Sequence, residues 1–270
     1  WRGQLVHYVA SKVLASLSAK GRIPDLEDVS AYILERFDTQ LAFSRERRYL
    51  REPKKSRGRL NIDWLALFEH EYGIEFEPGR VGRAREECVE AMRNLLESGM
   101  LSRIAGTDTS GWAIEDIDLG EFSQVFDFEG AKVFAKTDFM FRGNDGTFNI
   151  VDWKTFSGEY NGGKARVQLG VYGYYAASII GEPLDTIRLH EVNLLGDAAA
   201  VTEYRIGEDD LAEFYRRIGG GIERLSSVLI GGDIKRNEAL PPESFPRIES
   251  GRCRYCNFYR ICMDPESSCR

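Results

Sequence analysis

Two aspartates and a lysine are spaced so that they can share one divalent cation. Asp152 and Lys154 lie in residues 147–155, whose β-branched and aromatic content predicts a strand. Side chains two positions apart in a strand point to the same face, here about 6.6 Å apart. Asp138 lies upstream, across the turn signal GNDG at 143–146. Carboxylate oxygens suit a hard cation such as Mg²⁺, and a neighbouring lysine can orient or deprotonate an attacking water or stabilise charge on a phosphate.

A hairpin is expected to bring the two carboxylates together. Residues 131–141 predict a second strand, and the turn at 143–146 makes it antiparallel to 147–155. Folding back in this way brings Asp138 near Asp152. The same pattern also fits a surface hairpin with an Asp–Lys cross-strand pair. The D-x-K triplet alone therefore does not decide between a metal site and a charged surface.

A helix predicted for residues 164–180 adds two polar groups to this region. It follows the glycine-containing loop 158–163, and Gln168 and Tyr172 lie one turn apart on one of its faces. Packed over the end of the hairpin, the helix would present both groups to the carboxylates. An amphipathic helix with a core-facing Tyr172 explains the tyrosine equally, but it explains the ordered combination of motifs less well.

The combination of Asp138, then Asp152-x-Lys154, then Gln168-x-x-x-Tyr172 resembles the active-site signature of the PD-(D/E)XK nucleases, in particular their RecB-like branch. The resemblance implies that the two aspartates bind a catalytic Mg²⁺ or Mn²⁺ ion and that the lysine assists the water. It also implies that Gln168 and Tyr172 contact the site and the nucleic acid.

Two further features of that branch have counterparts here. The branch carries a metal-binding histidine in a G-x-x-x-H pattern on an early helix, and GQLVH at 3–7 matches it, so His7 is expected to be a ligand. Family members often have G-x-x-D where this chain has AKTD at 135–138, a mild departure. Glu121 is a candidate for a glutamate that the family places near the start of its sheet.

Four of the five cysteines lie within the last eighteen residues of the sequence. Thiolates clustered in this way in a cytosolic protein indicate a metal site rather than disulfides. Zinc or an iron–sulfur cluster would each be satisfied by four thiolates, and the spacing does not choose between them. The clustered residues are Cys253, Cys256, Cys262 and Cys269.

The C-x₂-C-x₅-C spacing at the end of a RecB-like chain is similar to the iron–sulfur staple of bacterial helicase–nucleases and CRISPR adaptation nucleases. The resemblance implies a [4Fe–4S] cluster, with Zn²⁺ as the alternative. In those relatives the fourth cysteine lies upstream of the histidine helix. Here the fourth ligand stays open between Cys269, Cys88 and a residue before the start of this sequence, and Cys88 also fits simple packing on the apolar side of a helix.

A basic segment, residues 45–59, is the candidate nucleic-acid contact. The formal net charge of the whole chain is −7. The cations of this segment can neutralise phosphates, and Tyr49 can stack on a base. A solvated loop is an equally good interpretation, because Pro53 and Gly58 interrupt the run. The residues assigned to nucleic-acid binding are Arg45, Arg47, Arg48, Lys54 and Lys55.

The expected fold class is α/β, a restriction-endonuclease-like mixed central sheet flanked by helices, with a helical N-terminal lobe and a C-terminal cysteine-rich metal staple. One nuclease domain is expected over 1–270, divided into a mainly helical lobe (1–120), the catalytic sheet and helices (121–230), and a linker with the cysteines (231–270). Helices are predicted at 5–17, 25–43, 61–72, 80–98 and 209–230. The sheet is predicted to start at 124–128 and to end with a hairpin of 186–195 and 200–206.

The function implied is a metal-dependent deoxyribonuclease, expected to be an exonuclease that processes single strands or DNA ends, as in DNA repair. The alternative is a catalytically degenerate nucleic-acid-binding or assembly module of a helicase or defence complex. A small-molecule phosphohydrolase is disfavoured, because the sequence has no glycine-rich phosphate cradle. The expected partners are DNA, as single strands or duplex ends, and a helicase or a nucleic-acid-processing complex, and no membrane partner is expected. The sequence shows neither an apolar run of about 18 residues nor a signal-peptide pattern, so a soluble cytoplasmic protein is expected.

Overall fold

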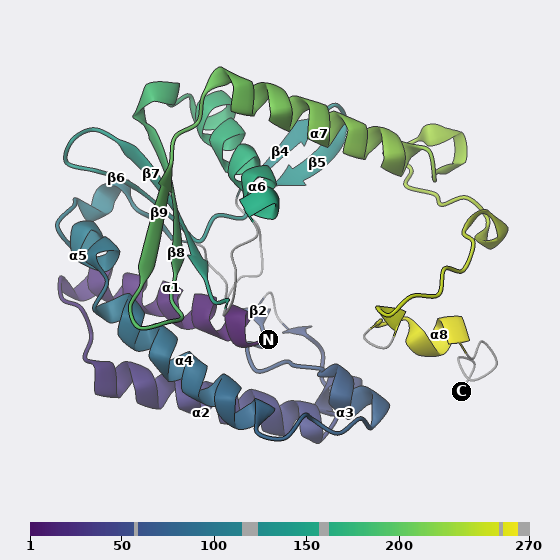
Figure 1. Ribbon diagram of the computed structural model, residues 1–270, viewed down its shortest axis with the longest axis horizontal. Helices are drawn as coiled ribbons and strands as arrows, with labels where there is room; N and C mark the ends of the chain where they lie inside the picture. Colours follow the sequence, from purple (N-terminus) through teal and green to yellow (C-terminus); the bar gives the residue numbers. More distant parts are fainter. Residues whose placement is uncertain (57–58, 115–123, 157–161, 254–255, 264–270) are drawn as a thin grey trace.

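A five-stranded mixed sheet forms the centre of the computed structural model, which describes residues 1–56, 59–114, 124–156, 162–253 and 256–263 (Figure 1). The strand order is β3-β6-β7-β8-β9. β7 and β8 are parallel, and the other neighbouring pairs are antiparallel. The strands are β3 (Ala113–Ile114), β6 (Phe139–Arg142), β7 (Phe148–Lys154), β8 (Ile187–Asn193) and β9 (Ala200–Tyr204). The mixed α/β architecture expected from the sequence is confirmed.

One face of the sheet is covered by helices from the first 105 residues. Their apolar sides enclose a large core together with Phe139, Val151 and Trp153 of the sheet. This layer begins at the first described residues and contains the helices that were expected near 5–17, 25–43 and 80–98. The helices of this layer are α1 (Arg2–Lys20), α2 (Leu26–Arg45), α4 (Arg80–Leu96) and α5 (Gly99–Ala105).

The opposite face is covered by the helix that crosses over from β7 to β8 and by the helix that follows β9 (Figure 1). The second core lies here and contains Ile150, Leu189 and Phe214. Alternation along β7 thus divides its side chains between the two cores, as the strand period requires. The elements are α6 (Gly162–Tyr174), continued by a π-helical stretch (Tyr175–Ile180), and α7 (Glu208–Ser226).

The strand expected over 131–141 is divided in two. Residues 131–134 form β5 (Ala131–Phe134), which pairs with β4 (Val125–Phe128) in a separate two-stranded sheet, so 124–128 does not start the central sheet as expected. The Gln124 side-chain oxygen accepts hydrogen bonds from the backbone N–H and the hydroxyl of Thr137, at 2.9 and 2.8 Å. These bonds hold the chain in a bend, and only β6 continues beside β7.

The helix expected over 61–72 is also wrong in most of its length. Only α3 (Phe68–Tyr72) is helical. The Asn61 side chain accepts a hydrogen bond from the backbone N–H of Asp63 at 3.1 Å, and such local bonds compete with helix formation. The segment before it contains a short hairpin of β1 (Lys55–Ser56) and β2 (Arg59–Leu60).

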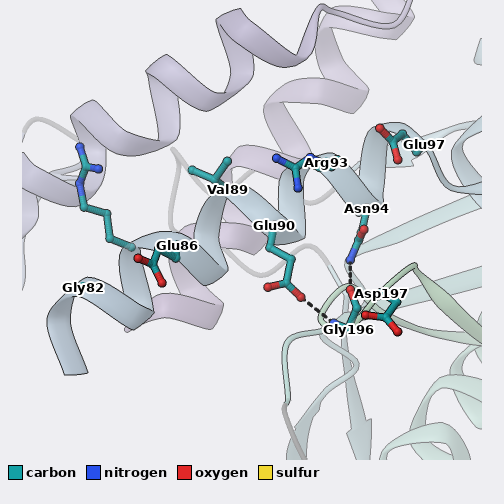
Figure 2. A pocket seen from close by; sticks show the side chains of 10 residues that line it. Gly82, Glu86, Val89, Glu90, Arg93, Asn94, Glu97, Gly196 and Asp197 are labelled. Atoms are coloured by element: carbon teal, nitrogen blue, oxygen red, sulfur yellow. Dashed lines mark hydrogen bonds between the residues drawn. The ribbon is translucent and has the colours of Figure 1, made fainter. Parts of the chain in front are cut away.

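The turn between β8 and β9 is fastened to α4 (Figure 2). Asn94 Nδ2 donates to the backbone oxygens of Leu194 and Gly196, at 3.0 and 2.9 Å. Glu90 Oε1 accepts from the Gly196 N–H at 2.7 Å. This hairpin was expected from the sequence, and the helical layer fixes its position.

The chain ends with a segment that runs from α7 towards the side of the molecule where α3 lies, and it includes α8 (Tyr259–Met263) (Figure 1). Tyr72 on α3 donates a hydrogen bond to the backbone oxygen of Asn257 at 3.0 Å. Among the helices that the structure describes, none combines the length and the apolar character needed to span a bilayer.

Candidate functional site

Asp138 and Asp152 lie next to each other because β6 and β7 pair in antiparallel register, with Phe139 opposite Val151. Asp138 is 8% exposed and Asp152 is 3% exposed. Asp138 Oδ2 accepts a hydrogen bond from the Trp153 backbone N–H at 2.7 Å. The bend before β6 therefore places the Asp138 carboxylate against β7, the strand that carries Asp152.

His7 reaches this pair from α1. Its Nδ1 lies 2.7 Å from Asp138 Oδ1, which accepts the Nδ1 hydrogen. When the imidazole is neutral, this bond leaves Nε2 as the nitrogen that can bind a cation. The structure thus brings together the three residues that the sequence suggested as metal ligands.

The start of α1 is held at the end of β7 by two contacts. The Arg2 guanidinium donates to the backbone oxygen of Thr155 and pairs with Glu87 on α4. A Cβ added to Gly3 would lie 3.0 Å from Thr155 Oγ1, so a residue without a side chain allows this close approach. The position of α1 therefore explains why a glycine stands at residue 3 and why the His7 side chain, one turn later, reaches Asp138.

Lys154 joins the acids to α6. Its Nζ forms an ion pair with Asp152 Oδ2 and donates a hydrogen bond to Gln168 Oε1 at 2.7 Å. Gln168 Nε2 lies 2.6 Å from the hydroxyl of Tyr172, which donates to the backbone oxygen of Lys136. The same-face arrangement of Gln168 and Tyr172 expected from the sequence is confirmed, and Tyr172 is at the same time a buried core residue.

Glu191 is a fifth acidic or basic group at this site, which the sequence analysis missed. It pairs with Asp152 in the parallel register of β7 and β8, so both side chains point to the same face. Glu191 is 4% exposed, and its Oε1 lies 4.0 Å from Lys154 Nζ. The available signal was an acid inside the otherwise largely apolar run at 187–195.

Burial and mutual charge change the protonation of the site. Burial raises the pKa of Asp152, the neighbouring Asp138 carboxylate raises it further, and Lys154 opposes both effects. Burial lowers the pKa of His7, but the charge of Asp138 and its hydrogen bond outweigh this effect and raise that pKa above its usual value. Both groups therefore hold a proton more tightly than they would in water.

These side chains open into one pocket of about 890 Å³. It lies between the end of β7, the start of α1 and the segment that follows α2. His7, Asp138, Asp152, Lys154 and Gln168 all contribute to its lining. This is the size of a pocket that encloses a small ligand.

The donor set fits a hard divalent cation. It offers two carboxylates, whose oxygens such ions prefer, and the imidazole of His7 adds a nitrogen ligand of the kind that transition metals accept. Asp152 Oδ2 is a buried oxygen whose contact in the described part of the chain is the ion pair with the Lys154 ammonium. The acids are paired with His7 and Lys154, however, and no three His, Cys, Asp or Glu side chains among the described residues are arranged as a ready-made metal site.

The basic segment divides in the structure. Arg47 pairs with Glu71 at 2.9 Å, and Arg48 pairs with Glu52 at 2.7 Å. Arg45 and Lys55 are exposed away from the pocket lining. Lys54 is therefore the one of the five assigned cations that lines the pocket of the carboxylates.

The clustered cysteines lie outside this pocket. Cys253, Cys256 and Cys262 are free thiols in the described C-terminal segment. Cys269 and Glu121 lie outside the described residues. Cys88 is fully buried in the core beneath α1, and burial raises the pKa of its thiol to about 12, so Cys88 has the environment of a packed neutral side chain.

Two comparisons with known proteins complete this picture. A family model described as the PD-(D/E)XK nuclease superfamily matches residues 1–263. The match includes the histidine helix, both aspartates, the lysine and three of the clustered cysteines. The search of curated proteins found no match to the chain.

Proposed function

The chain belongs to the PD-(D/E)XK nuclease superfamily, and from this premise we propose that it is a divalent-metal-dependent deoxyribonuclease of the RecB-like branch. Its substrate is a DNA single strand or a DNA end, cleaved as an exonuclease. The single observation that supports the proposal most is the convergence of His7, Asp138, Asp152 and Lys154 in one pocket.

The roles of the residues follow from their positions. Asp138, Asp152 and the Nε2 atom of His7 would hold Mg²⁺ or Mn²⁺. A bound cation supplies charge neutralisation at the phosphate and a more acidic water. Lys154 orients the attacking water and stabilises negative charge on the phosphate oxygens. Gln168 holds the ammonium of Lys154 by its hydrogen bond of 2.7 Å.

Cleavage of labelled single- and double-stranded DNA tests the proposal. Wild-type protein with added Mn²⁺ is expected to cut, and EDTA is expected to stop it. Asp152→Ala and Lys154→Ala are each expected to lose cleavage while the folded structure is retained. Asp197→Ala, which removes an exposed carboxylate in the β8–β9 turn, is the matched control and keeps wild-type activity. Cleavage retained by purified Asp152→Ala would contradict the proposed metal site.

One observation favours a second function, a nucleic-acid-binding or assembly module of a helicase or defence complex. The described acids are already paired with His7 and Lys154 instead of being arranged as a preformed metal site. Such a module binds DNA without cutting it at any Mn²⁺ concentration. The cleavage assay above, combined with a binding assay on the same oligonucleotides, separates the two functions.

The C-terminal cysteines support a second metal centre. We propose that Cys253, Cys256 and Cys262 ligate a [4Fe–4S] cluster, with Cys269 as the fourth ligand. The contacts of Tyr72 with Asn257 and with the ring of Tyr259, 6.2 Å between centroids, place this segment beside α3. A cluster there would fasten the end of the chain to the helical layer.

Anaerobically purified protein tests the cluster directly. A broad absorbance band near ~400 nm is expected for iron–sulfur, whereas bound zinc is colourless. Cys256→Ser is expected to lose the band and to lower the melting temperature. A Cys256→Ser protein with unchanged metal content and unchanged melting would contradict this assignment.

A further inference from the structure

The pocket of the carboxylates continues to a wall of aromatic and basic residues that the proposed chemistry does not use. Trp64 and Lys54 line this wall, together with the apolar side chains of Leu60 and Ile62. All four belong to the segment 54–64, which follows α2 and contains the β1–β2 hairpin. One cavity of about 890 Å³ thus joins an aromatic ring and a cation to the buried acids.

The ring of Trp64 is fixed in place before any ligand binds. Its Nε1 donates a hydrogen bond to the backbone oxygen of Glu52 at 3.0 Å. Tyr49 packs against it at 66°, with 6.2 Å between the ring centroids. An aromatic ring held in this way loses little conformational freedom when a second flat group stacks on it.

Lys54 lies over the face of that ring, with its Nζ 5.5 Å from the centroid. The lysine is exposed, and an exposed cation–π contact is weaker than the stacking of a nucleobase on an aromatic side chain. A base can therefore displace the ammonium from the ring face. The flexible lysine then remains close enough to neutralise a phosphate of the same strand.

We propose that Trp64 and Lys54 form a subsite for an unpaired nucleotide of the substrate, in which the base stacks on Trp64 and the backbone phosphate pairs with Lys54. This inference rests on the proposed nuclease function and identifies the residues that select single-stranded nucleic acid. Inside a duplex both faces of each base are covered by the neighbouring base pairs, so neither face is free for the Trp64 ring. Stacking on Trp64 therefore requires a base that has left its pair.

The geometry favours a different aromatic residue for this part from the one that the sequence suggested. Tyr49 was the sequence-based candidate for stacking, but its hydroxyl donates to Glu71 at 2.6 Å and it does not line the pocket. Trp64 occupies the position facing the cavity, and Tyr49 supports it from behind the pocket lining. The Trp64 ring thus faces the ligand, and the Tyr49 ring packs against Trp64 and holds it in place.

Binding of a fluorescently labelled oligo(dT), measured by anisotropy without added divalent metal, tests the subsite. Trp64→Ala is expected to bind about tenfold more weakly than wild type, because it loses base stacking. Trp64→Phe keeps a ring and is expected to recover most of the affinity. An oligonucleotide with abasic sites is expected to bind wild type and Trp64→Ala equally.

Lys54 and Lys132 provide a matched pair for the phosphate contact. Lys54→Ala is expected to weaken binding about threefold and to make the salt dependence shallower by about 0.7 in the log–log slope, the loss of one phosphate contact on a single strand. Lys132→Ala, which removes an exposed lysine on β5 outside the pocket lining, is expected to bind as wild type does. Thermal melting of every variant verifies folding.

Two results would overturn the subsite: wild-type affinity for oligo(dT) in a folded Trp64→Ala protein, or equal effects of Lys54→Ala and Lys132→Ala. These outcomes differ from failure of the nuclease function. A wild-type protein that cuts DNA with Mn²⁺ but binds independently of Trp64 lacks only the subsite. A protein whose binding depends on Trp64 but which never cuts lacks only the nuclease activity.

Discussion

His7 and Asp138 are 131 residues apart in the sequence, yet the imidazole Nδ1 and the carboxylate Oδ1 lie 2.7 Å apart. We expect His7→Ala to weaken Mn²⁺ binding by about 10–100-fold, the usual loss when a group at a metal site is removed. Isothermal titration with Mn²⁺ measures it. His70→Ala is the control, because His70 contacts Ser44 and lies outside the pocket lining. Equal Mn²⁺ affinity of His7→Ala and wild type would contradict the role of His7.

Protons compete with the metal at this site. The pKa values of Asp152 and His7 are both raised, so both groups retain protons over a pH range in which free side chains have lost them. A bound cation must displace these protons. Mn²⁺ is therefore expected to bind more tightly at pH 8 than at pH 6, with proton release seen as buffer-dependent heat in calorimetry. Affinity independent of pH over this range would contradict the assignment.

Glu191 and Asp152 flank the ammonium of Lys154. Glu191→Gln keeps the shape of the side chain but removes one of the two charges that position Lys154. We expect kcat for DNA cleavage to fall about tenfold, equal to about 1.4 kcal/mol in the barrier, with little change in KM. Glu203→Gln on β9, which removes a more exposed carboxylate, is the control. A change in KM alone would indicate a binding role instead.

Two glycines on α6 give a matched pair for packing. A Cβ on Gly173 would lie 2.8 Å from Ile206 Cγ1, whereas a Cβ on Gly170 would lie at an ordinary 3.5 Å from Phe214 Cβ. We expect Gly173→Ala to lower the free energy of unfolding by about 1–3 kcal/mol through overpacking. Gly170→Ala is expected to keep or raise it by up to about 1 kcal/mol through helix propensity. Urea unfolding measures both, and similar values for the two variants would contradict this packing.

His190 makes the fold sensitive to acid. Its Nε2 lies 2.9 Å from Asn149 Oδ1, and its buried Nδ1 has no hydrogen-bond partner among the described residues. Burial and the nearby Arg103 guanidinium lower the pKa of His190 to about 4. The unfolded chain takes up this proton near pH 6.5, so the stabilising effect is complete above pH 6.5 and is lost as the pH falls towards 4.

The expected loss is about 3 kcal/mol at most, because folding lowers the pKa of His190 from 6.5 to about 4. Denaturant unfolding of wild type and His190→Gln between pH 7 and pH 4 measures it as the difference in slope. The variant has no proton to take up at this position and is expected to lose less stability on acidification. Parallel curves for the two proteins would contradict the buried neutral imidazole.

Local sequence signals were sufficient for the elements that carry the site. The period of two in residues 147–155 gave β7 with Asp152 and Lys154 on one side, and the period of the first helix placed His7 on α1. The spacing of Gln168 and Tyr172 correctly predicted their contact. These features depend on residues a few positions apart, so a pattern in the sequence contains them.

Features that depend on distant residues were missed. The predicted strand 131–141 is divided in two because the Gln124 side chain bonds to Thr137. Strand propensity is calculated from neighbouring residues and does not include a contact between residues thirteen positions apart. Glu191 belongs to the site only through the parallel register of β8 beside β7. Trp64 was placed in the helix predicted for 61–72. The hydrogen bond of the Asn61 side chain with the Asp63 N–H, which competes with that helix, could not be foreseen from the residue type alone.

The composite origin of the site has a consequence for the newly made chain. His7 comes from the first helix and the two aspartates come from the middle of the sequence, while Glu191, the acid beside Lys154, comes from β8. During synthesis the first helix leaves the ribosome long before those strands exist. The pocket cannot be complete until translation has passed β8 and that strand has paired with β7, so an unfinished chain would lack the full proposed site.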